Sequence, residues 1–230
     1  MPRFRQTFQT GSRERVKPLR LNQLADTMCA STLGMIPVAF PVALDVTMLH
    51  FRNLVPKSLM QIGIISDTHG FLDPKVFEAF EDCDEIWHAG DFGSLEIAEQ
   101  LADFKPLKGV YGNIDDSSLR QSYPENLRFD CDGVDVLMTH IAGRPGRYPS
   151  RVKRLLEDST PDVLVCGHSH IVQVENDLKH KKMKYINPGA AGHEGQHVMR
   201  TLIKLQCKKG KLRDMKLVEL GPRGRASNVN

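Results

Sequence analysis

The chain has 230 residues, of which 40% are apolar and 26% are charged, as in ordinary globular proteins. This length accommodates one domain with a sizeable hydrophobic core and some additional sequence. The formal net charge of +3 comes from the first 59 residues, which carry eight Lys/Arg and three acidic residues, whereas the rest of the chain carries 23 and 25. A domain with this slightly acidic balance is not expected to hold nucleic acid as a stable partner.

The five cysteines are odd in number and form no C-x-x-C pair. This pattern favours a reduced, cytoplasmic protein over a secreted one that depends on disulfides. The most apolar stretch, Met35 to Leu49, is interrupted by Pro37, Pro41 and Asp45, so no segment has the length of an uninterrupted membrane span. We therefore expect a cytoplasmic protein that has no membrane partner.

Residues 1–59 show no steady helical or strand period, and they begin with Arg-rich sequence. We expect this basic prefix to be poorly ordered, the folded domain to extend over residues 60–220, and residues 221–230 to form a disordered tail. Two origins of the prefix stay open. It could come from a start codon assigned too far upstream, or it could be a targeting segment, which its few acidic residues and several arginines would suit.

From Met60 onward, strand-like and helix-like segments alternate. We predict strands over residues 62–65, 85–89, 107–110, 126–130, 134–139 and 162–166. Helices are predicted to begin at Asp73-Pro74, where Asp caps and Pro occupies the first turn, at Ser94, and near Ser150. The rest of the chain reads as strands over residues 171–175, 183–186, 199–207 and 212–220. An α/β part followed by an all-β part indicates two packed sheets with helices outside.

Side chains that can bind metals follow five of these predicted strands. They comprise two carboxylates, one carboxamide and four imidazoles: Asp67, His69, Asp91, Asn113, His140, His168 and His170. Because ligands of α/β proteins bind beyond the carboxyl ends of strands, we expect the seven side chains at one edge of a sheet. Such a set suits Mn²⁺, Fe²⁺, Zn²⁺ or Co²⁺. Seven ligands fit two ions that share a carboxylate better than they fit one ion.

The ordered motifs Asp67-x-His69, Gly90-Asp91, Gly112-Asn113, His140 and Gly167-His168-x-His170 resemble those of the calcineurin-like metallophosphoesterase superfamily. The short body and the Asn187-Pro188-Gly189 loop are similar to its compact YfcE-type phosphodiesterase branch. The resemblance implies two mixed β-sheets sandwiched between helices and two divalent ions, with Mn²⁺ expected first. It implies that one ion is held by Asp67, His69, Asp91 and His170, and the other by Asp91, Asn113, His140 and His168.

By the same resemblance, a hydroxide that bridges the two ions attacks phosphorus in line. The chain is thus expected to be a dinuclear metal-dependent phosphodiesterase for a small substrate, with Asp91, Asn113 and His69 as its catalytic residues. Phosphoprotein phosphatases of the superfamily follow Gly-Asn with a His that assists the leaving group, whereas this chain has Ile114, then Asp115. Because Ile114 cannot donate a proton, we expect acidic leaving groups to be preferred. Asp115 is expected to orient a ligand.

Two alternatives stay open, together with a homo-oligomeric state. One is a phosphomonoesterase or nucleotidase of the same fold, against which Ile114 argues. The other is a non-catalytic interaction scaffold like the retromer subunit Vps29, which has this fold and an impaired metal site. Loss of the second residue of the Asp-x-His pair would mark such a scaffold, but His69 is present.

Other polar residues receive plainer interpretations. His88 is expected to be a structural group and not a ligand. His180, His193 and His197 lie in polar or Gly-rich sequence and are expected to be solvated. A basic run after His140 is expected to form a solvated helix face; it comprises Arg144, Arg147, Arg151, Lys153 and Arg154.

Overall fold

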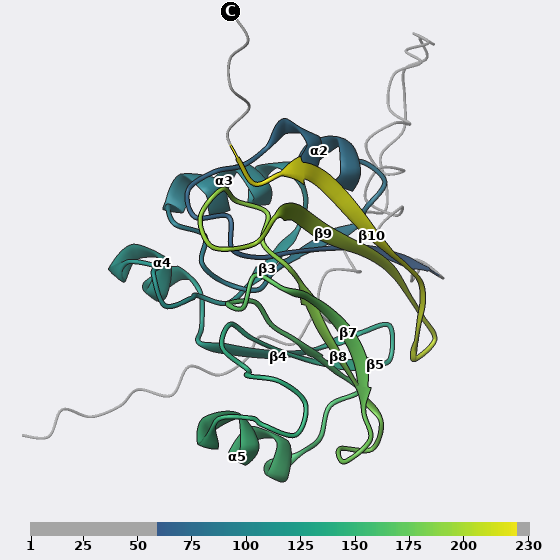
Figure 1. Ribbon diagram of the computed structural model, residues 1–230. Helices are drawn as coiled ribbons and strands as arrows, with labels where there is room; N and C mark the ends of the chain where they lie inside the picture. Colours follow the sequence, from purple (N-terminus) through teal and green to yellow (C-terminus); the bar gives the residue numbers. More distant parts are fainter. Residues whose placement is uncertain (1–58, 225–230) are drawn as a thin grey trace, which may run out of the picture. The chain divides into compact units, whose positions relative to one another are not determined.

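The computed structural model describes residues 59–224, which Figure 1 draws in colour. The predicted prefix, apart from its last residue, and residues 225–230 lie outside the described residues. Within them are ten strands and four helices. The helices are α2 (Pro74–Phe80), α3 (Leu95–Phe104), α4 (Ser117–Ser122) and α5 (Ser150–Asp158). Among residues 59–224, no helix is long and apolar enough to cross a membrane.

The first sheet has the strand order β10-β9-β1-β2-β3. Its strands are β1 (Met60–Ile65), β2 (Glu85–His88), β3 (Leu107–Gly109), β9 (Met199–Lys208) and β10 (Lys211–Pro222). The neighbours β1, β2 and β3 run parallel, and β9 and β10 are antiparallel. The register pairs Ile65 with His88 and His88 with Gly109, so the three parallel strands end level with one another.

The second sheet has the order β4-β5-β6-β8-β7. Its strands are β4 (Asn126–Cys131), β5 (Val134–Thr139), β6 (Val163–Val165), β7 (Val172–Asp177) and β8 (Met183–Pro188). β5, β6 and β8 are parallel, whereas the two edge strands are antiparallel to their neighbours. The predicted pair of mixed sheets is therefore confirmed.

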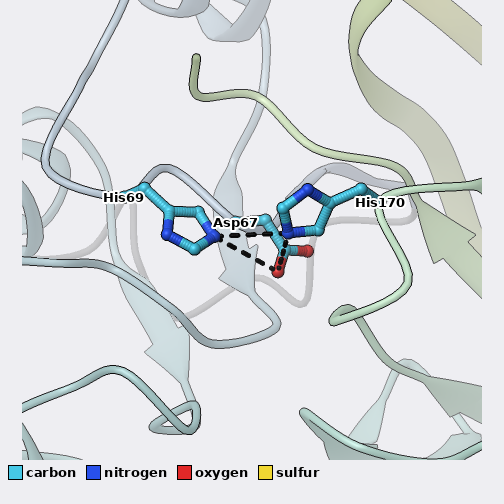
Figure 2. Close-up of side chains that lie close together, drawn as sticks. All are labelled: Asp67, His69 and His170. Atoms are coloured by element: carbon cyan, nitrogen blue, oxygen red, sulfur yellow. Dashed lines mark hydrogen bonds and ion pairs between the residues drawn. The ribbon is translucent and has the colours of Figure 1, made fainter. Parts of the chain in front are cut away.

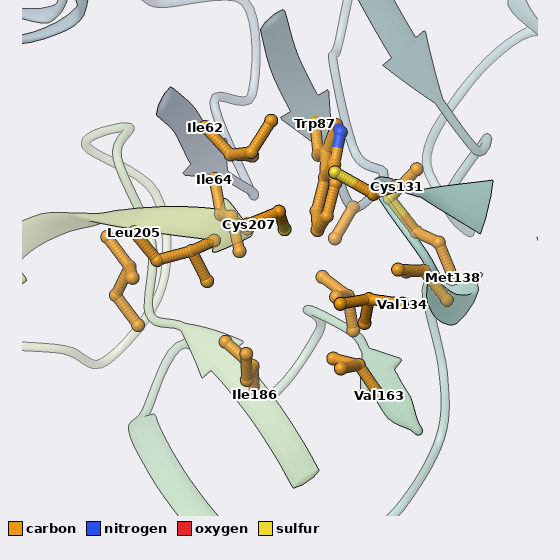
Figure 3. Close-up of a cluster of buried hydrophobic side chains, with 14 of the residues drawn as sticks. Ile62, Ile64, Trp87, Cys131, Val134, Met138, Val163, Ile186, Leu205 and Cys207 are labelled. Atoms are coloured by element: carbon orange, nitrogen blue, oxygen red, sulfur yellow. The ribbon is translucent and has the colours of Figure 1, made fainter. Parts of the chain in front are cut away.

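Alternation along the strands explains how the layers pack. Ile62 and Ile64 point into a core between the two sheets, which is drawn in Figure 3, and Val136 and Met138 reach it from the second sheet. The intervening Leu137 faces away from that core. It packs in a separate cluster with residues of α5. Each sheet thus has one face on the other sheet and one face on helices.

The helices lie on the two outer sides, as Figure 1 shows for α2 and α3 on one side and α5 on the other. Val76 and Phe80 of α2 and Leu101 of α3 are buried against the first sheet. The start of α2 is as predicted, because the Asp73 side chain accepts a hydrogen bond from Lys75 N and Pro74 stands in the first turn.

Two features differ from the expected elements. The short helix α4 was not predicted, because its six residues contain only one buried apolar side chain, Leu119, and so show no helical period. Strand β10 runs to Pro222, two residues beyond the expected end of the domain at residue 220, because Pro222 still pairs with Met199 of β9.

Candidate metal centre

Loops at the carboxyl ends of five parallel strands carry the seven expected metal ligands. Asp67 and His69 follow β1, Asp91 follows β2 and Asn113 follows β3. His140 follows β5 of the second sheet, and the loop after β6 carries His168 and His170. The expectation of a single sheet edge was therefore wrong: the loops come from two sheets. The sandwich brings both sets of strand ends together, and the backbone N–H of His168 donates to both Asp67 oxygens, at 3.2 and 3.1 Å.

Five of these seven residues have left-handed backbone conformations. Their φ angles are 54° at Asp67, 48° at His69, 57° at Asp91, 67° at His168 and 57° at His170. A positive φ costs free energy in any residue with a Cβ atom. Such conformations persist only where the surrounding structure imposes them, and they concentrate at functional sites.

Glycines before the ligands are needed mainly for close approach. A Cβ atom at Gly112 would collide with Asp91 Oδ1, and one at Gly167 would collide with Ser66 Oγ. Neither of these glycines has a positive φ, so close approach is the reason for glycine at both positions, whereas Gly90 before Asp91 has a φ of 94°. Their missing side chains let the loops of the two sheets touch the carboxylates directly.

Three of the seven side chains form a first cluster, termed group one: Asp67, His69 and His170. Figure 2 shows the two imidazoles approaching the carboxylate from different loops. His170 Nε2 lies 3.2 Å from Asp67 Oδ1, and the Nε2 atoms of the two histidines are 3.3 Å apart. Asp67 is fully buried, whereas the side chains of His69 and His170 are 14% and 13% exposed.

The second cluster, termed group two, contains Asp91, Asn113, His140 and His168. Donor atoms of Asp91, His140 and His168 lie within 4.8 Å of one another. His140 Nε2 is 3.2 Å from Asp91 Oδ2 and 3.1 Å from Asn113 Oδ1. The other imidazole nitrogen, Nδ1, lies 2.8 Å from the Ala89 carbonyl. This carbonyl fixes the His140 ring so that Nε2 faces the carboxylate.

The two groups meet at one atom, Asp91 Oδ2. It lies 3.2 Å from His140 Nε2 of group two and 3.7 Å from His69 Nε2 of group one. Ligands about 2.1 Å from one ion lie about 3.0–3.4 Å from one another. Two separations in group one, 3.2 and 3.3 Å, and two in group two, 3.2 and 3.1 Å, match this range, whereas His69 Nε2 lies 4.0 Å from Asp67 Oδ1. The donor types and these separations fit a divalent ion in each group.

Burial and charge set the protonation of these side chains. Burial opposes protonation of His140, but the hydrogen bond to Asp91 and the charges of Asp67 and Asp91 outweigh it and raise the pKa of His140. Burial likewise opposes ionisation of Asp91, but the hydrogen bonds from His140 and from Ile114 N prevail and lower the pKa of Asp91. The hydrogen bond to Asp67 raises the pKa of His170. The site therefore concentrates negative charge that cations can neutralise.

Comparison with known proteins assigns the family. The family model described as "Calcineurin-like phosphoesterase superfamily domain" matches residues 60–210. The chain belongs to the calcineurin-like phosphoesterase superfamily. It is 32% identical over 139 residues, 57% of this chain and 77% of its relative, to a probable metallophosphoesterase of Methanothermobacter thermautotrophicus. The superfamily predicted from the motif order is thus confirmed, and with it a metal-dependent phosphoesterase.

Solved structures share the phosphoesterase fold. An archaeal phosphodiesterase is 24% identical with a TM-score of 0.54, and the match covers 69% of this chain and 100% of that one. Vps29 of Entamoeba histolytica complexed with Zn²⁺ is 15% identical with a TM-score of 0.53, covering 72% of this chain and 100% of that one. At these identities the likeness concerns the fold alone.

Residues around the metal centre of this phosphoesterase hold its loops in place. Asp115 accepts hydrogen bonds from Gly112 N at 2.7 Å and from Gly93 N at 2.9 Å, and so joins the loops that follow β3 and β2. The Asn187 side-chain amide donates to the Gly167 carbonyl at 2.8 Å, which supports the loop that carries His168 and His170. Both contacts hold ligand loops, as expected for Asp115.

His88 is structural, as expected. Gly90 N donates to His88 Nδ1 at 3.2 Å, which assigns the proton to Nε2, 3.0 Å from Thr68 Oγ1. The ring stacks on Phe92 with centroids 3.6 Å apart. Complete burial and the nearby positive charge of His140 lower the pKa of His88 to about 3, so its imidazole stays neutral.

The histidines expected to be solvated have specific contacts instead. His197 Nε2 lies 3.1 Å from the Gly192 carbonyl, and its ring packs edge-on against that of His170, with centroids 5.3 Å apart. His193 packs on Phe71, and His180 pairs with Asp177 at 2.8 Å. The contacts of His193 and His197 depend on the return of the chain to the site, so the local pattern of their Gly-rich loop does not predict them, whereas His180 and Asp177 are only three positions apart.

Two cavities border the metal centre, one beside each group. The cavity beside group two has a volume of about 180 Å³, and its lining includes Asn113, His140, Arg120 and Arg151. The cavity beside group one has a volume of about 550 Å³, and its lining includes His69.

Arg151 belongs to the basic run that was expected to be a solvated helix face, so that interpretation was wrong for this residue. Lys153 and Arg154 are exposed on α5 as expected, whereas Arg144 and Arg147 are exposed but lie in the loop before the helix.

Proposed function

We propose that this protein is a dinuclear phosphodiesterase that hydrolyses a small phosphodiester with an acidic leaving group. The observation that carries the proposal is the position of Asp91 Oδ2 between the two groups, 3.2 Å from His140 Nε2 and 3.7 Å from His69 Nε2. A single carboxylate oxygen shared by two clusters of imidazole and oxygen donors suits a pair of ions about 3.5–4 Å apart.

We assign the ligands as the motif order suggested. Asp67, His69 and His170 would hold one ion, Asn113, His140 and His168 the other, and Asp91 both. The ions would supply positive charge for the phosphoryl oxygens and an acidified water at neutral pH. The mixture of carboxylate, carboxamide and imidazole donors favours Mn²⁺, with Fe²⁺, Zn²⁺ and Co²⁺ as alternatives.

The chain's own residues position these ligands without help from a metal. The Ile114 backbone N–H donates to Asp91 Oδ1 at 3.0 Å, which leaves Oδ2 to face both groups. The Ala89 carbonyl fixes the His140 ring, and Asn113 Oδ1 lies 3.1 Å from His140 Nε2. Preorganised ligands reduce the reorganisation that metal binding would otherwise require.

The preference for acidic leaving groups rests on Ile114. Its side chain is 46% exposed beside the site and carries no proton donor. A leaving alkoxide would therefore lack a general acid at this position, whereas p-nitrophenolate needs none. The two cavities suit a diester because the phosphorus of a diester carries two ester arms, and one cavity borders each group.

The proposal is tested by hydrolysis of bis-p-nitrophenyl phosphate by the full chain supplied with Mn²⁺. The matched monoester, p-nitrophenyl phosphate, has the same leaving group. We expect a higher kcat/KM for the diester and loss of both activities in chelator. A higher kcat/KM for the monoester would instead establish the phosphomonoesterase alternative.

Likeness of fold to Vps29 keeps a non-catalytic scaffold as the second candidate. The protein would then show no turnover of either ester with any of the four metals, even with two ions bound.

We also propose a reducing, cytoplasmic location, because the four cysteines of the described residues are free and buried.

A further inference from the structure

We propose that the 180 Å³ cavity beside group two binds a second anionic group of the substrate, a phosphate or a carboxylate carried on one ester arm. This inference rests on the proposed function, since it concerns the substrate of the same metal centre. The subsite would require a second negative charge on the substrate, which the metal ligands themselves do not require.

Arg120 supplies the positive charge for this subsite. Its Nε donates to the Asp115 carbonyl at 2.7 Å, and Nη2 lies within hydrogen-bond distance of the Gly112 and Asn113 carbonyls, at 3.3 and 3.1 Å. These partners are neutral, and none of the carboxylates in residues 59–224 forms an ion pair with Arg120. Nη1 has no hydrogen bond within the described part of the chain, so both of its N–H groups are available to an oxyanion.

The Arg120 guanidinium is held in a fixed position. Three carbonyls orient it, and it lies over the Tyr111 ring, 4.7 Å from the ring centroid. A preorganised guanidinium loses little conformational entropy when it binds an oxyanion in the bidentate geometry that it favours. Arg120 is an exposed residue, but these contacts hold its guanidinium in one orientation.

Arg151 also lines the cavity, and its charge is partly neutralised. Its Nη1 donates to Thr139 Oγ1 at 3.1 Å and Nη2 donates to the Ile141 carbonyl at 3.0 Å, which anchors it to the end of β5. Its Nε pairs with Glu125 Oε1 at 3.1 Å, and the Glu125 side chain is 49% exposed. The lining thus contains two arginines against one carboxylate, which leaves an excess positive charge facing the cavity.

The volume and the position of the cavity suit an ester arm of the substrate. The cavity is far larger than the roughly 10–15 Å³ that one water needs, and its lining includes Asn113 and His140 of group two. A phosphoryl group held at the metal centre would therefore have one of its arms directed toward Arg120. An anion at the end of a short arm would meet the available N–H groups.

The test uses three ligands with the same three-carbon arm: propyl phosphate, 3-phosphonooxypropionate and propane-1,3-diol bisphosphate. Their dissociation constants are measured by calorimetry on the full chain loaded with Mn²⁺, so the readout does not require turnover. We expect the carboxylate-ended ligand, the bisphosphate or both to bind at least about tenfold tighter than propyl phosphate. The bisphosphate has two equivalent phosphate groups, either of which can occupy the metal centre. Statistics alone therefore make it bind twofold tighter than propyl phosphate.

Variants separate a subsite from a merely structural arginine. Arg120→Gln should reduce the anion preference to about twofold or less, while propyl phosphate binds nearly as in the wild type. Glu125→Gln should increase the preference a few-fold, because it frees the charge of Arg151. Arg154→Gln is the matched control, since it removes an exposed positive charge from the same helix as Arg151 and should leave the ratio unchanged.

Equal affinities for the three ligands in the wild type would overturn the subsite. An equal loss for all three ligands in Arg120→Gln would also overturn it, because that result assigns Arg120 to support of the Gly112–Asn113 loop alone. Anion preference in a protein that does not hydrolyse bis-p-nitrophenyl phosphate would leave the subsite standing and remove the proposed hydrolysis.

Discussion

Group one and group two contain similar donors but are held by different contacts. In group two, the Ala89 carbonyl orients His140, and the Ile114 N–H orients Asp91. In group one, Asp67 is held by the His168 N–H, but neither imidazole has a backbone hydrogen bond among the described residues. The His140 side chain is 3% exposed, whereas those of His69 and His170 are 14% and 13% exposed.

This difference indicates that group two contains the most preorganised pair of ligands, Asp91 and His140, although its His168 is exposed. Partners that orient a ligand typically change metal affinity by about 10–100-fold when they are removed. We therefore expect an ion at group two to bind more tightly than an ion at group one. Asp91 belongs to both halves, so its loss tests them together, and the other ligands test them separately.

Asp91→Asn should have the largest effect. The substitution retains an acceptor for Ile114 N but removes the negative charge that faces both groups. We expect kcat/KM for bis-p-nitrophenyl phosphate to fall by at least about 1,000-fold. Circular dichroism and the thermal midpoint of the metal-free protein serve as the folding control. Retention of full activity would refute the shared role of Asp91.

Removal of one imidazole from each group should separate the two halves. After Mn²⁺ loading and passage through a desalting column, His69→Gln should retain one tightly bound ion, held by group two. His140→Gln should lose its tight ion and show an affinity at least about tenfold lower. Metal content is measured by elemental analysis on the eluted protein. The reverse order of retention would show that preorganisation does not set affinity here.

Ile114→His should have an intermediate effect confined to substrates with poor leaving groups. A new imidazole beside Asn113 could protonate the departing oxygen, so hydrolysis of methyl p-nitrophenyl phosphate should stay nearly constant while that of alkyl phosphomonoesters rises by about tenfold or more. Release of p-nitrophenol is measured for the aryl diester, and release of inorganic phosphate is measured for the alkyl monoesters. Ile114→Gln controls for the added polarity, and an equal gain in that variant would exclude proton donation.

His88→Gln should have the smallest effect on activity, and its informative effect is on the pH dependence of stability. The pKa of His88 in the folded protein is about 3, below its ordinary value of 6.5, so the unfolded chain binds a proton that the folded chain rejects. Stability is therefore lost as pH falls below about 6.5, by about 1 kcal/mol between pH 6 and 5. Urea unfolding at both pH values should show this decrease in the wild type and a smaller one in His88→Gln. Identical decreases would contradict a neutral, buried His88.

Much of the candidate metal centre could be predicted from the sequence, because each ligand directly follows its own strand along the chain. A run such as Ile62 to Ile65 that ends in Asp67 and His69 specifies both a buried strand and ligands at its carboxyl end. The same pattern recurs before Asp91 and His140, so the order of ligands along the chain was readable. Helix α4 was not, because six residues with one buried apolar side chain give no period.

What the tertiary structure alone decided is how distant segments meet. The ligands belong to two sheets because β5 and β6 hydrogen-bond to each other and not to β1, a choice set by long-range pairing that no local pattern records. The same packing places Arg120 of α4 and Arg151 of α5 at one cavity, although 31 positions separate them. Sequence by itself thus indicated the seven candidate ligands and the strand ends that carry them, while the approach of the two sheets brought these side chains together and formed the cavity beside them.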